Sequence, residues 1–357
     1  MSYFRGRVAM AECLKAAGVK SGDFVAIQAL TCVAVAEAVM AIGAKPLWID
    51  IDPNTVTMSA DALSAAWRED VKAVVVQHTF GVMSDMEALL SVIDNRVPVI
   101  EDCCHTLLSS LNGTRAGHFG IASFYSFEWG KPLILGTGGA AFTKDAALRE
   151  RLMEQRARFS RPKPMDEIKL AIQRVAFGLL YRPSLYWKVR AIFRHLSKLG
   201  LVVGNYNPVG PGMVSQDFST TMSKSAENRL EKALRGAHDD AERRVTLTKL
   251  YEDIIGNRND VQAIKTVPNS VDILVRYPLW IKDKDDFLEQ AKANHIEAAG
   301  WYATPVHPLT EKDWPAVGYE ANSCPNAEHM AKHLVSFPLS PKTTPQTIRS
   351  IAKILPK

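Results

Sequence analysis

The chain has 357 residues, of which 47% are hydrophobic and 23% are charged, and its formal net charge is +5 at pH 7. This composition is typical of a globular protein and excludes an intrinsically disordered, collagen-like or coiled-coil chain. The charge is too small to indicate nucleic-acid binding, although it is compatible with an anionic small molecule.

The first half of the chain alternates short apolar runs with helical patterns. The runs are mostly continuous, which predicts strands buried on both faces, and the helices between them indicate crossover connections in a mostly parallel sheet. In such a sheet a ligand lies beyond the carboxyl ends of the strands, so residues that follow strands are candidates for a site. The predicted strands are 24–27, 46–49, 71–77, 97–101, 122–127 and 139–143, with helices over 33–42 and 62–67.

The composition changes near residue 168. Between Ile168 and Leu201 the sequence has seven lysines and arginines and no acidic residue. Apolar residues recur there at helical spacing, from Leu185 to Leu199, and predict an amphipathic helix. We interpret 168–212 as a basic insertion that packs on the body or at a subunit interface. Contact with a membrane or a lipid-linked substrate through 168–201 is an alternative that is not favoured, and a nucleic-acid site is favoured least.

The remainder of the chain predicts a second, smaller unit. A helical pattern covers 222–255, a strand pattern covers 273–280, and a further helix is predicted over 284–295. We therefore expect a large domain at 1–237, which contains the insertion, and a smaller α+β domain at 238–357.

Cysteines and the N-terminus indicate a reducing compartment. The five cysteines are odd in number and include no C-x-x-C pair, which argues against a disulfide scaffold and a structural zinc site. No run of 18 apolar residues predicts a membrane-spanning helix, and residues 1–7 have no secretory pattern. We expect a cytoplasmic protein.

The strand that ends near Glu101 is followed by Asp102, two cysteines and His105. A buried carboxylate needs a cationic partner, and a ring-nitrogen cation held by Asp102 would be one. A metal site is disfavoured, because adjacent residues on extended chain point to opposite faces and no other ligand cluster matches. No metal is expected.

Lys131 lies in an apolar and aromatic stretch, 123–132, after a predicted strand. A lysine in this position is normally only exposed to solvent, but an amine desolvated by such neighbours is a candidate nucleophile. This one follows Asp102 and precedes the Gly-rich segment 136–139. A lysine that binds the cofactor covalently, with an aspartate on the pyridinium nitrogen, is the protein's half of pyridoxal phosphate chemistry.

Short motifs in a characteristic order extend over most of the chain. From the N-terminus they are Gly6-Arg7-Val8-Ala9, Ser21-Gly22-Asp23, Thr31-Cys32, Gly43-Ala44-Lys45-Pro46, Asp50-Ile51-Asp52, His78-Thr79-Phe80-Gly81, Glu101-Asp102, Ser126-Phe127, Lys131, Gly138-Gly139, Pro305-Val306-His307 and Ser336-Phe337-Pro338-Leu339. In this order and spacing the chain resembles the DegT/DnrJ family of pyridoxal-phosphate-dependent sugar aminotransferases, a branch of fold type I. The resemblance implies an α/β fold whose large domain has a mostly parallel mixed sheet flanked by helices, with a smaller α+β C-terminal domain.

The resemblance also implies roles for individual residues. Lys131 would bind pyridoxal 5′-phosphate covalently and move the substrate proton, and Asp102 would keep the pyridine nitrogen protonated. His105 would lie near the phenolic oxygen of the ring. The other implied contacts are Ser126 and the backbone amides of Gly6, Arg7 and Val8 on the phosphate, Cys32 at the ring face, and Trp301, Tyr302 and His307 on the substrate.

The implied activity is that of a homodimeric aminotransferase. It would move an amino group from a donor such as glutamate to a keto-sugar, with a nucleotide-linked sugar favoured, as in amino sugar and polysaccharide biosynthesis. The alternatives are another pyridoxal-phosphate-dependent reaction on a sugar or cyclitol, and a cofactor-binding regulator without turnover. The presence of Lys131 disfavours the branch of the family that replaces this lysine and dehydrates its substrate.

Overall fold

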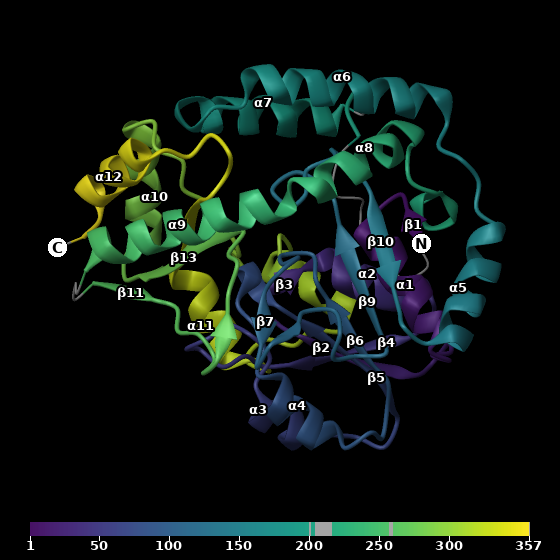
Figure 1. The fold of residues 1–357 in the computed structure, drawn as a ribbon. Coiled ribbons are helices and arrows are strands. Elements are labelled where there is room, and N and C mark those ends of the chain that lie inside the picture. The colour runs from purple at the N-terminus through teal and green to yellow at the C-terminus, as the bar shows by residue number, and fades with distance from the viewer. Residues whose placement is uncertain (200, 204–215, 257–259, 357) are drawn as a thin grey trace.

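A seven-stranded sheet forms the centre of the computed structural model, which describes residues 1–199, 201–203, 216–256 and 260–356 (Figure 1). The five strands from β9 to β4 are mutually parallel. Strand β10 runs antiparallel to β9, and β1 at the edge of the sheet runs antiparallel to β10. This is the mixed, mostly parallel sheet that the sequence predicts. In spatial order the strands are β1 (Ser2–Tyr3), β10 (Gly139–Phe142), β9 (Ala122–Ser126), β6 (Val99–Asp102), β5 (Val71–Gln77), β2 (Phe24–Gln28) and β4 (Lys45–Ile49).

Both faces of this sheet are buried, as the continuous apolar runs predict. Along β2, Val25 and Ile27 join one hydrophobic cluster and Ala26 joins another, because successive side chains of a strand point to opposite faces. Helices α1 and α2 cover the first face, with α5 beside α1, and α3 and α4 cover the second (Figure 1). The helices are α1 (Gly6–Ala16), α2 (Val33–Ala41), α3 (Ala60–Ala65), α4 (Met86–Ile93) and α5 (Ala146–Ala157).

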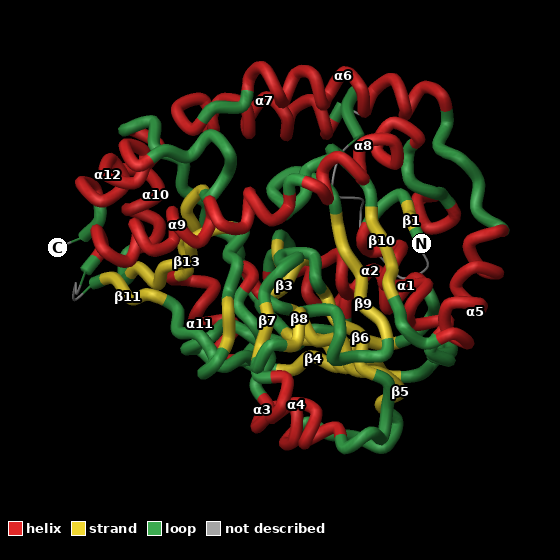
Figure 2. The backbone as a smooth tube through the Cα atoms, viewed as in Figure 1, coloured by secondary structure: helices red, strands yellow, loops and turns green. Residues whose placement is uncertain are grey.

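The C-terminal half contains a second sheet, which is antiparallel and has three strands (Figure 2). Its apolar cluster is centred on Tyr251, Phe287 and Phe337. The proposed domain boundary after residue 237 stays a prediction. The elements here are α8 (Lys224–Arg235), α9 (Ala237–Ile255), β11 (Val261–Ala263), β13 (Arg276–Ile281), α10 (Lys284–Ala293), α11 (Pro325–His333), β15 (Leu334–Pro338) and α12 (Pro345–Ile354).

Two predicted elements differ from the structure here. The helix expected over 222–255 is two helices, which meet at Gly236. The strand expected from residue 273 begins at Arg276, because the residues before it bond to loops of the first half. The Ile273 amide donates to Ser109 Oγ at 2.9 Å, and the Val275 amide donates to the Phe80 carbonyl at 2.8 Å.

One C-terminal segment returns to the first half of the chain, where it forms a two-stranded sheet. Strand β14 (Val306–His307) pairs in parallel with β3 (Thr31–Cys32), and Tyr302, Val306 and Trp314 belong to the same cluster as α1 and α2. Residues near 301 are thereby brought to the edge where α2 begins. A small sheet of β7 (Ser110–Leu111), β8 (Thr114–Arg115) and β12 (Ser270–Val271) forms a further link between the halves.

The basic insertion forms a helical hairpin across one end of the molecule (Figure 1). Its helices are α6 (Pro164–Leu180) and α7 (Tyr186–Lys198), and α7 matches the predicted amphipathic helix. The hairpin packs on the body: Trp187 Nε1 donates to the Ile296 carbonyl at 2.8 Å, and Lys342 Nζ donates to the Gly178 carbonyl at 3.0 Å. The end of the predicted insertion, 204–212, lies outside the described residues. Across the part of the chain that the structure describes, no helix has the length and hydropathy needed to cross a membrane.

Candidate active site

A pocket lies beyond the carboxyl ends of β5, β6 and β9, where the sheet topology predicts a ligand. Its walls come from α1, from the start of α2, from the loops after β6 and β9, and from the segment at residues 301–302. It brings together all but two of the predicted site residues: Gly6, Arg7, Cys32, Asp102, His105, Ser126, Lys131, Trp301 and Tyr302.

Lys131 reaches the pocket from the turn that follows β9. Gly130 has a φ of 79°, which favours glycine, and the Lys131 amide donates to the Glu128 carbonyl at 3.3 Å. The ammonium lies 5.6 Å from the centre of the Trp301 ring. Among the described residues, the Lys131 ammonium forms neither a hydrogen bond nor an ion pair. The Lys131 amine therefore lines the pocket without a bond to another described side chain.

Asp102 is the last residue of β6 and is buried in the pocket wall. Its Oδ1 accepts a hydrogen bond of 2.9 Å from the Cys104 amide. Burial raises the pKa of the Asp102 carboxyl above its ordinary value, while the Cys104 thiol and amide and the charge of Lys131 oppose that shift. A cationic N–H in the pocket would stabilise this carboxylate, so the site fits a protonated pyridine ring.

His105 is held as a neutral imidazole. Its Nδ1 accepts a hydrogen bond of 3.1 Å from the Phe80 amide, which assigns the ring proton to Nε2. Burial and the charge of Lys131 keep the pKa of His105 well below its ordinary value. The ring stacks on Phe80, with centroids 6.0 Å apart, and lies 5.3 Å from Trp301. His105 thus offers the pocket an N–H donor that persists below neutral pH.

The first turn of α1 and Ser126 form a cradle that suits an anion. A Cβ at Gly6 would lie 2.9 Å from Ser126 Cβ, so a glycine is required for the helix to start this close to β9. Ser126 lines the pocket beside this turn. The Arg7 guanidinium, beside them, forms a buried ion pair with Glu37 of α2. A helix N-terminus with a hydroxyl and a guanidinium is suited to a phosphate.

Two predicted contacts are not part of the pocket. The Val8 amide donates to the Arg5 carbonyl at 3.2 Å, so it closes the first turn of α1, and the Val8 side chain is buried in the core. The contact of this amide with the phosphate stays a prediction, since the amide is already bonded within the helix.

His307 lies behind the pocket wall. It pairs with Cys32 across β14 and β3, and its Nδ1 accepts from the Ala303 amide at 3.3 Å. Its ring contacts that of Tyr302 edge-on, with centroids 5.9 Å apart. Burial, with smaller contributions from Lys284, Arg190 and Arg194, lowers the pKa of His307 to about 4. These contacts support the segment that contains Tyr302, and the predicted contact of His307 with the substrate stays a prediction.

Several residues that line the pocket were not predicted from the sequence. Arg5 Nη1 donates to Glu128 and its Nε donates to Asp217, both at 2.6 Å, and Arg5 and Glu128 line the pocket together with Lys131. The sequence contains a signal for this pair, because a charged residue lies near each of two motifs: Arg5 beside Gly6, and Glu128 three residues before Lys131. The remaining missed residues are Met10, Ala34, Val35, Gln77, Cys104, Phe124 and Trp129.

The Gly-rich segment after Lys131 supports the start of α1. A Cβ at Gly139 would lie 2.4 Å from the Arg5 carbonyl oxygen, so only glycine lets β10 pass beneath the first turn. Thr137 Oγ1 also donates to the Phe4 carbonyl at 2.9 Å. The segment therefore acts on the site through backbone packing.

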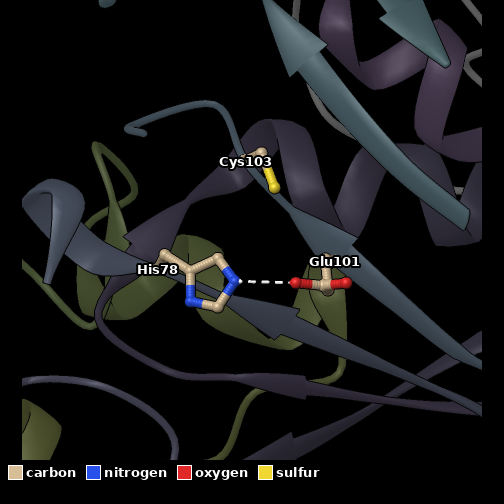
Figure 3. A group of neighbouring side chains, drawn as sticks. All are labelled: His78, Glu101 and Cys103. Atoms are coloured by element: carbon tan, nitrogen blue, oxygen red, sulfur yellow. Dashed lines mark hydrogen bonds and ion pairs between the residues drawn. The ribbon is translucent and has the colours of Figure 1, made fainter. Parts of the chain in front are cut away.

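His78, Glu101 and Cys103 form a buried cluster beside the pocket, with potential ligand atoms within 4.8 Å of one another (Figure 3). These atoms already have partners. Glu101 Oε2 accepts from His78 Nε2 at 3.2 Å and from the Gly117 amide at 2.7 Å, and its Oε1 accepts from the amides of Phe119 and Gly120 at 2.7 Å. His78 Nδ1 accepts from the Ser84 amide at 3.2 Å. The cluster is a hydrogen-bond network that holds the loop before β9.

Replacing Glu101 by glutamine should destabilise the protein by about 2–4 kcal/mol, because an amide NH₂ would face backbone N–H groups in a buried site. Urea unfolding measures the loss, and Asp70→Asn, on the exposed Asp70, is the control.

The same variant should change how stability depends on pH. Burial opposes ionisation of Glu101, but bonds from His78 and from the amides of Gly120 and Gly117 hold its pKa below the ordinary value. Wild-type stability should therefore fall as the pH falls through that depressed pKa, and the variant should lack this part of the acid dependence. An unchanged free energy of unfolding would contradict the role of the network.

The model of the DegT/DnrJ/EryC1/StrS aminotransferase family matches residues 4–173 and 220–356. A pleiotropic regulatory protein of Geobacillus stearothermophilus is 28% identical over 349 residues, which are 94% of this chain and 78% of that protein. An L-glutamine:scyllo-inosose aminotransferase of Streptomyces griseus is 36% identical over 163 residues, which are 45% of this chain and 38% of that protein. The match to this cyclitol aminotransferase therefore spans less than half of either protein.

Two solved structures share the fold over nearly the whole chain. DesV of S. venezuelae has a TM-score of 0.76 at 22% identity and covers 99% of this chain and 83% of its own. The E. coli GDP-4-keto-6-deoxy-D-mannose-3-dehydratase, solved with bound hydrated PLP, has a TM-score of 0.76 at 15% identity and covers 99% and 87%. At these identities the likeness establishes the fold alone.

Proposed function

Because the chain belongs to the DegT/DnrJ/EryC1/StrS aminotransferase family, we propose that it moves an amino group from a donor such as glutamate to the ketone of a sugar or cyclitol. Membership confirms the resemblance, the fold type and the cofactor, pyridoxal 5′-phosphate, that the sequence indicates. The observation that carries the proposal is the meeting of Lys131 and Asp102 in one pocket beside the first turn of α1.

Each part of the pocket has a task in this proposal. When bound, the cofactor supplies an electron sink for the substrate carbon. Asp102 holds the proton on the ring nitrogen, and Lys131 holds the cofactor and carries a proton to and from the substrate carbon. Gly6, Arg7 and Ser126 bind the phosphate. Trp301 and Tyr302, which line the pocket, contact the substrate.

The acceptor is proposed as a class. A keto-sugar, with a nucleotide-linked one favoured, is the expectation from the sequence, and the 36% identity to a cyclitol aminotransferase supports a cyclitol ketone as the second choice. The homodimer and the cytoplasmic location also stay predictions. The test incubates the purified protein with glutamate or glutamine and a panel of nucleotide-linked keto-sugars and inososes, and detects the amine product by mass spectrometry.

A cofactor-binding regulator is the second candidate, and the regulatory protein that matches 94% of the chain supports it. The panel separates the two candidates, with Lys131→Ala as the blank. An amine product with any acceptor supports the enzyme. A protein that binds the cofactor, but that no donor converts to the amine form, supports the regulator.

The His105 donor can be tested by paired substitutions. His105→Gln retains a side-chain N–H and should keep kcat within about tenfold, whereas His105→Phe retains only the stacking and should lose roughly a hundredfold. Glutamine can still accept from the Phe80 amide through its carbonyl oxygen, whereas phenylalanine cannot, so urea unfolding of both variants separates a loss of stability from the loss of the donor. Equal kcat values for the two variants would show that the donor has no part in turnover.

A further inference from the structure

Helix α6 carries a continuous apolar stripe on its outer face. Five apolar side chains recur at alternating spacings of three and four residues and are between 54% and 70% exposed. Single exposed apolar residues are ordinary on a protein surface, but a contiguous stripe is typical of a binding surface. The residues of the stripe are Met165, Ile168, Ile172, Val175 and Leu179.

The opposite face of α6 is already occupied by the protein. Leu170 and Gln173 are buried, and Arg174 Nη1 donates to Ser225 Oγ of α8 at 2.8 Å. Phe177 packs on Trp129, with centroids 4.2 Å apart. The stripe is therefore the side of the helix that faces away from the body, and Figure 1 shows the hairpin along the edge of the molecule.

The charge of the α6–α7 hairpin indicates the chemistry of the surface that it binds. The hairpin, 164–198, has seven basic residues and two acidic ones, Asp166 and Glu167 in the first turn of α6, and the acidic pair precedes all the basic residues. Of the basic side chains, Arg182, Lys188 and Arg194 are exposed. A contact between two copies of the hairpin would oppose two surfaces of the same sign, which is unfavourable. An anionic surface that also accepts apolar side chains satisfies both features, and a bilayer with acidic lipids is such a surface.

We propose that the α6–α7 hairpin binds the surface of a membrane that contains anionic lipids. The stripe enters the headgroup boundary, and the basic side chains contact the lipid phosphates, while the hairpin lies in the plane of the interface. Residues 174–219, which include Val175 and Leu179 of the stripe and all of α7, lie outside the ranges that the family model matches.

Membrane binding would place the pocket beside the lipid surface. The Trp129 ring that contacts Phe177 lines the pocket, and Tyr181 donates to Glu297 of the C-terminal half at 2.7 Å. The hairpin is thus attached to the pocket wall and to the C-terminal half. The proposal rests on the hairpin alone and does not depend on the amino-transfer reaction.

Vesicle flotation of the full chain, loaded with cofactor, tests the proposal. The protein should float with phosphatidylcholine vesicles that contain about one third phosphatidylglycerol, and much less with phosphatidylcholine alone. Ile172→Ser with Leu179→Ser should lower the partition coefficient at least about tenfold, because two apolar side chains lose their burial. Arg182→Glu with Lys188→Glu should lower it roughly thirtyfold in low salt, and added salt should weaken wild-type binding.

Matched variants elsewhere provide the controls. Met153→Ser on α5, where the methionine is 59% exposed, and Lys20→Glu, on an exposed lysine, should leave the partition coefficient unchanged. Circular dichroism checks that all variants fold. Equal flotation with neutral and anionic vesicles, or equal losses in the control variants, would overturn the proposal. The proposal would also be overturned if the wild type floated with neither kind of vesicle and the serine variant differed from it in mass by light scattering. The stripe would then be a subunit interface.

Discussion

Lys131→Ala is expected to lower turnover by at least about 10⁴-fold and to remove the visible absorbance of the lysine-bound cofactor. In the proposed function Lys131 supplies both the covalent bond to the cofactor and the group that moves the proton, so both functions would be lost together. Asp102, Ser126 and the first turn of α1 are unchanged in this variant. Excess pyridoxal phosphate should therefore still bind, without restoring turnover.

Two measurements check the Lys131 prediction. Steady-state kinetics gives the loss of turnover, and the spectrum after removal of free cofactor gives the loss of the covalent band. Lys144→Ala is the matched control, because this lysine is exposed near the end of β10. Turnover within about tenfold of wild type in Lys131→Ala would disprove the assignment of the reactive amine.

Asp102→Asn should lower kcat by about 10²–10⁴-fold while the fold is retained. The amide keeps an acceptor for the Cys104 N–H but lacks the charge that keeps the ring nitrogen protonated. Asp102→Glu, which keeps the charge at a displaced position, should lie between wild type and the asparagine variant. Kinetics under saturating cofactor measures the effect, with Asp61→Asn on α3 as the control.

Stability of the cofactor-free protein gives Asp102 a second readout. Burial raises the pKa of this carboxyl, so the folded state binds more protons than the unfolded state above the ordinary pKa. Wild-type stability should then fall as the pH rises through the interval between the ordinary and the raised value, and Asp102→Asn should lack this loss. The cofactor-free variant should be at least as stable as wild type at neutral pH. A less stable variant would mean that Asp102 serves packing, and not the cofactor.

The central sheet and the two central residues of the site were predictable for physical reasons. Continuous apolar runs predict buried parallel strands, and the ends of such strands converge, so Asp102 and Lys131 were expected to meet. The family resemblance then gave Ser126 and Gly6 their tasks. These inferences need only local patterns and the order of elements along the chain.

Other features depend on contacts that local sequence does not contain. Arg5 bonds Asp217, which is 212 positions away, and nothing near either residue indicates the pair. The Val8 amide was expected to face a ligand because the pattern gives a helix start but not which amides its first turn already uses. The outward direction of the α6 stripe likewise follows from what packs on its other face, including Trp129.

The visible spectrum of the purified, cofactor-loaded protein, before and after addition of glutamate, tests the central claim most directly. The site described here predicts a band from the lysine-bound cofactor that disappears with glutamate, or with glutamine as the donor, and returns with the matching keto acid. A band that no amino donor changes would contradict the claim that this pocket transfers amino groups. A protein that shows no band even with added pyridoxal phosphate would contradict the assignment of Lys131 and Asp102 as a cofactor site.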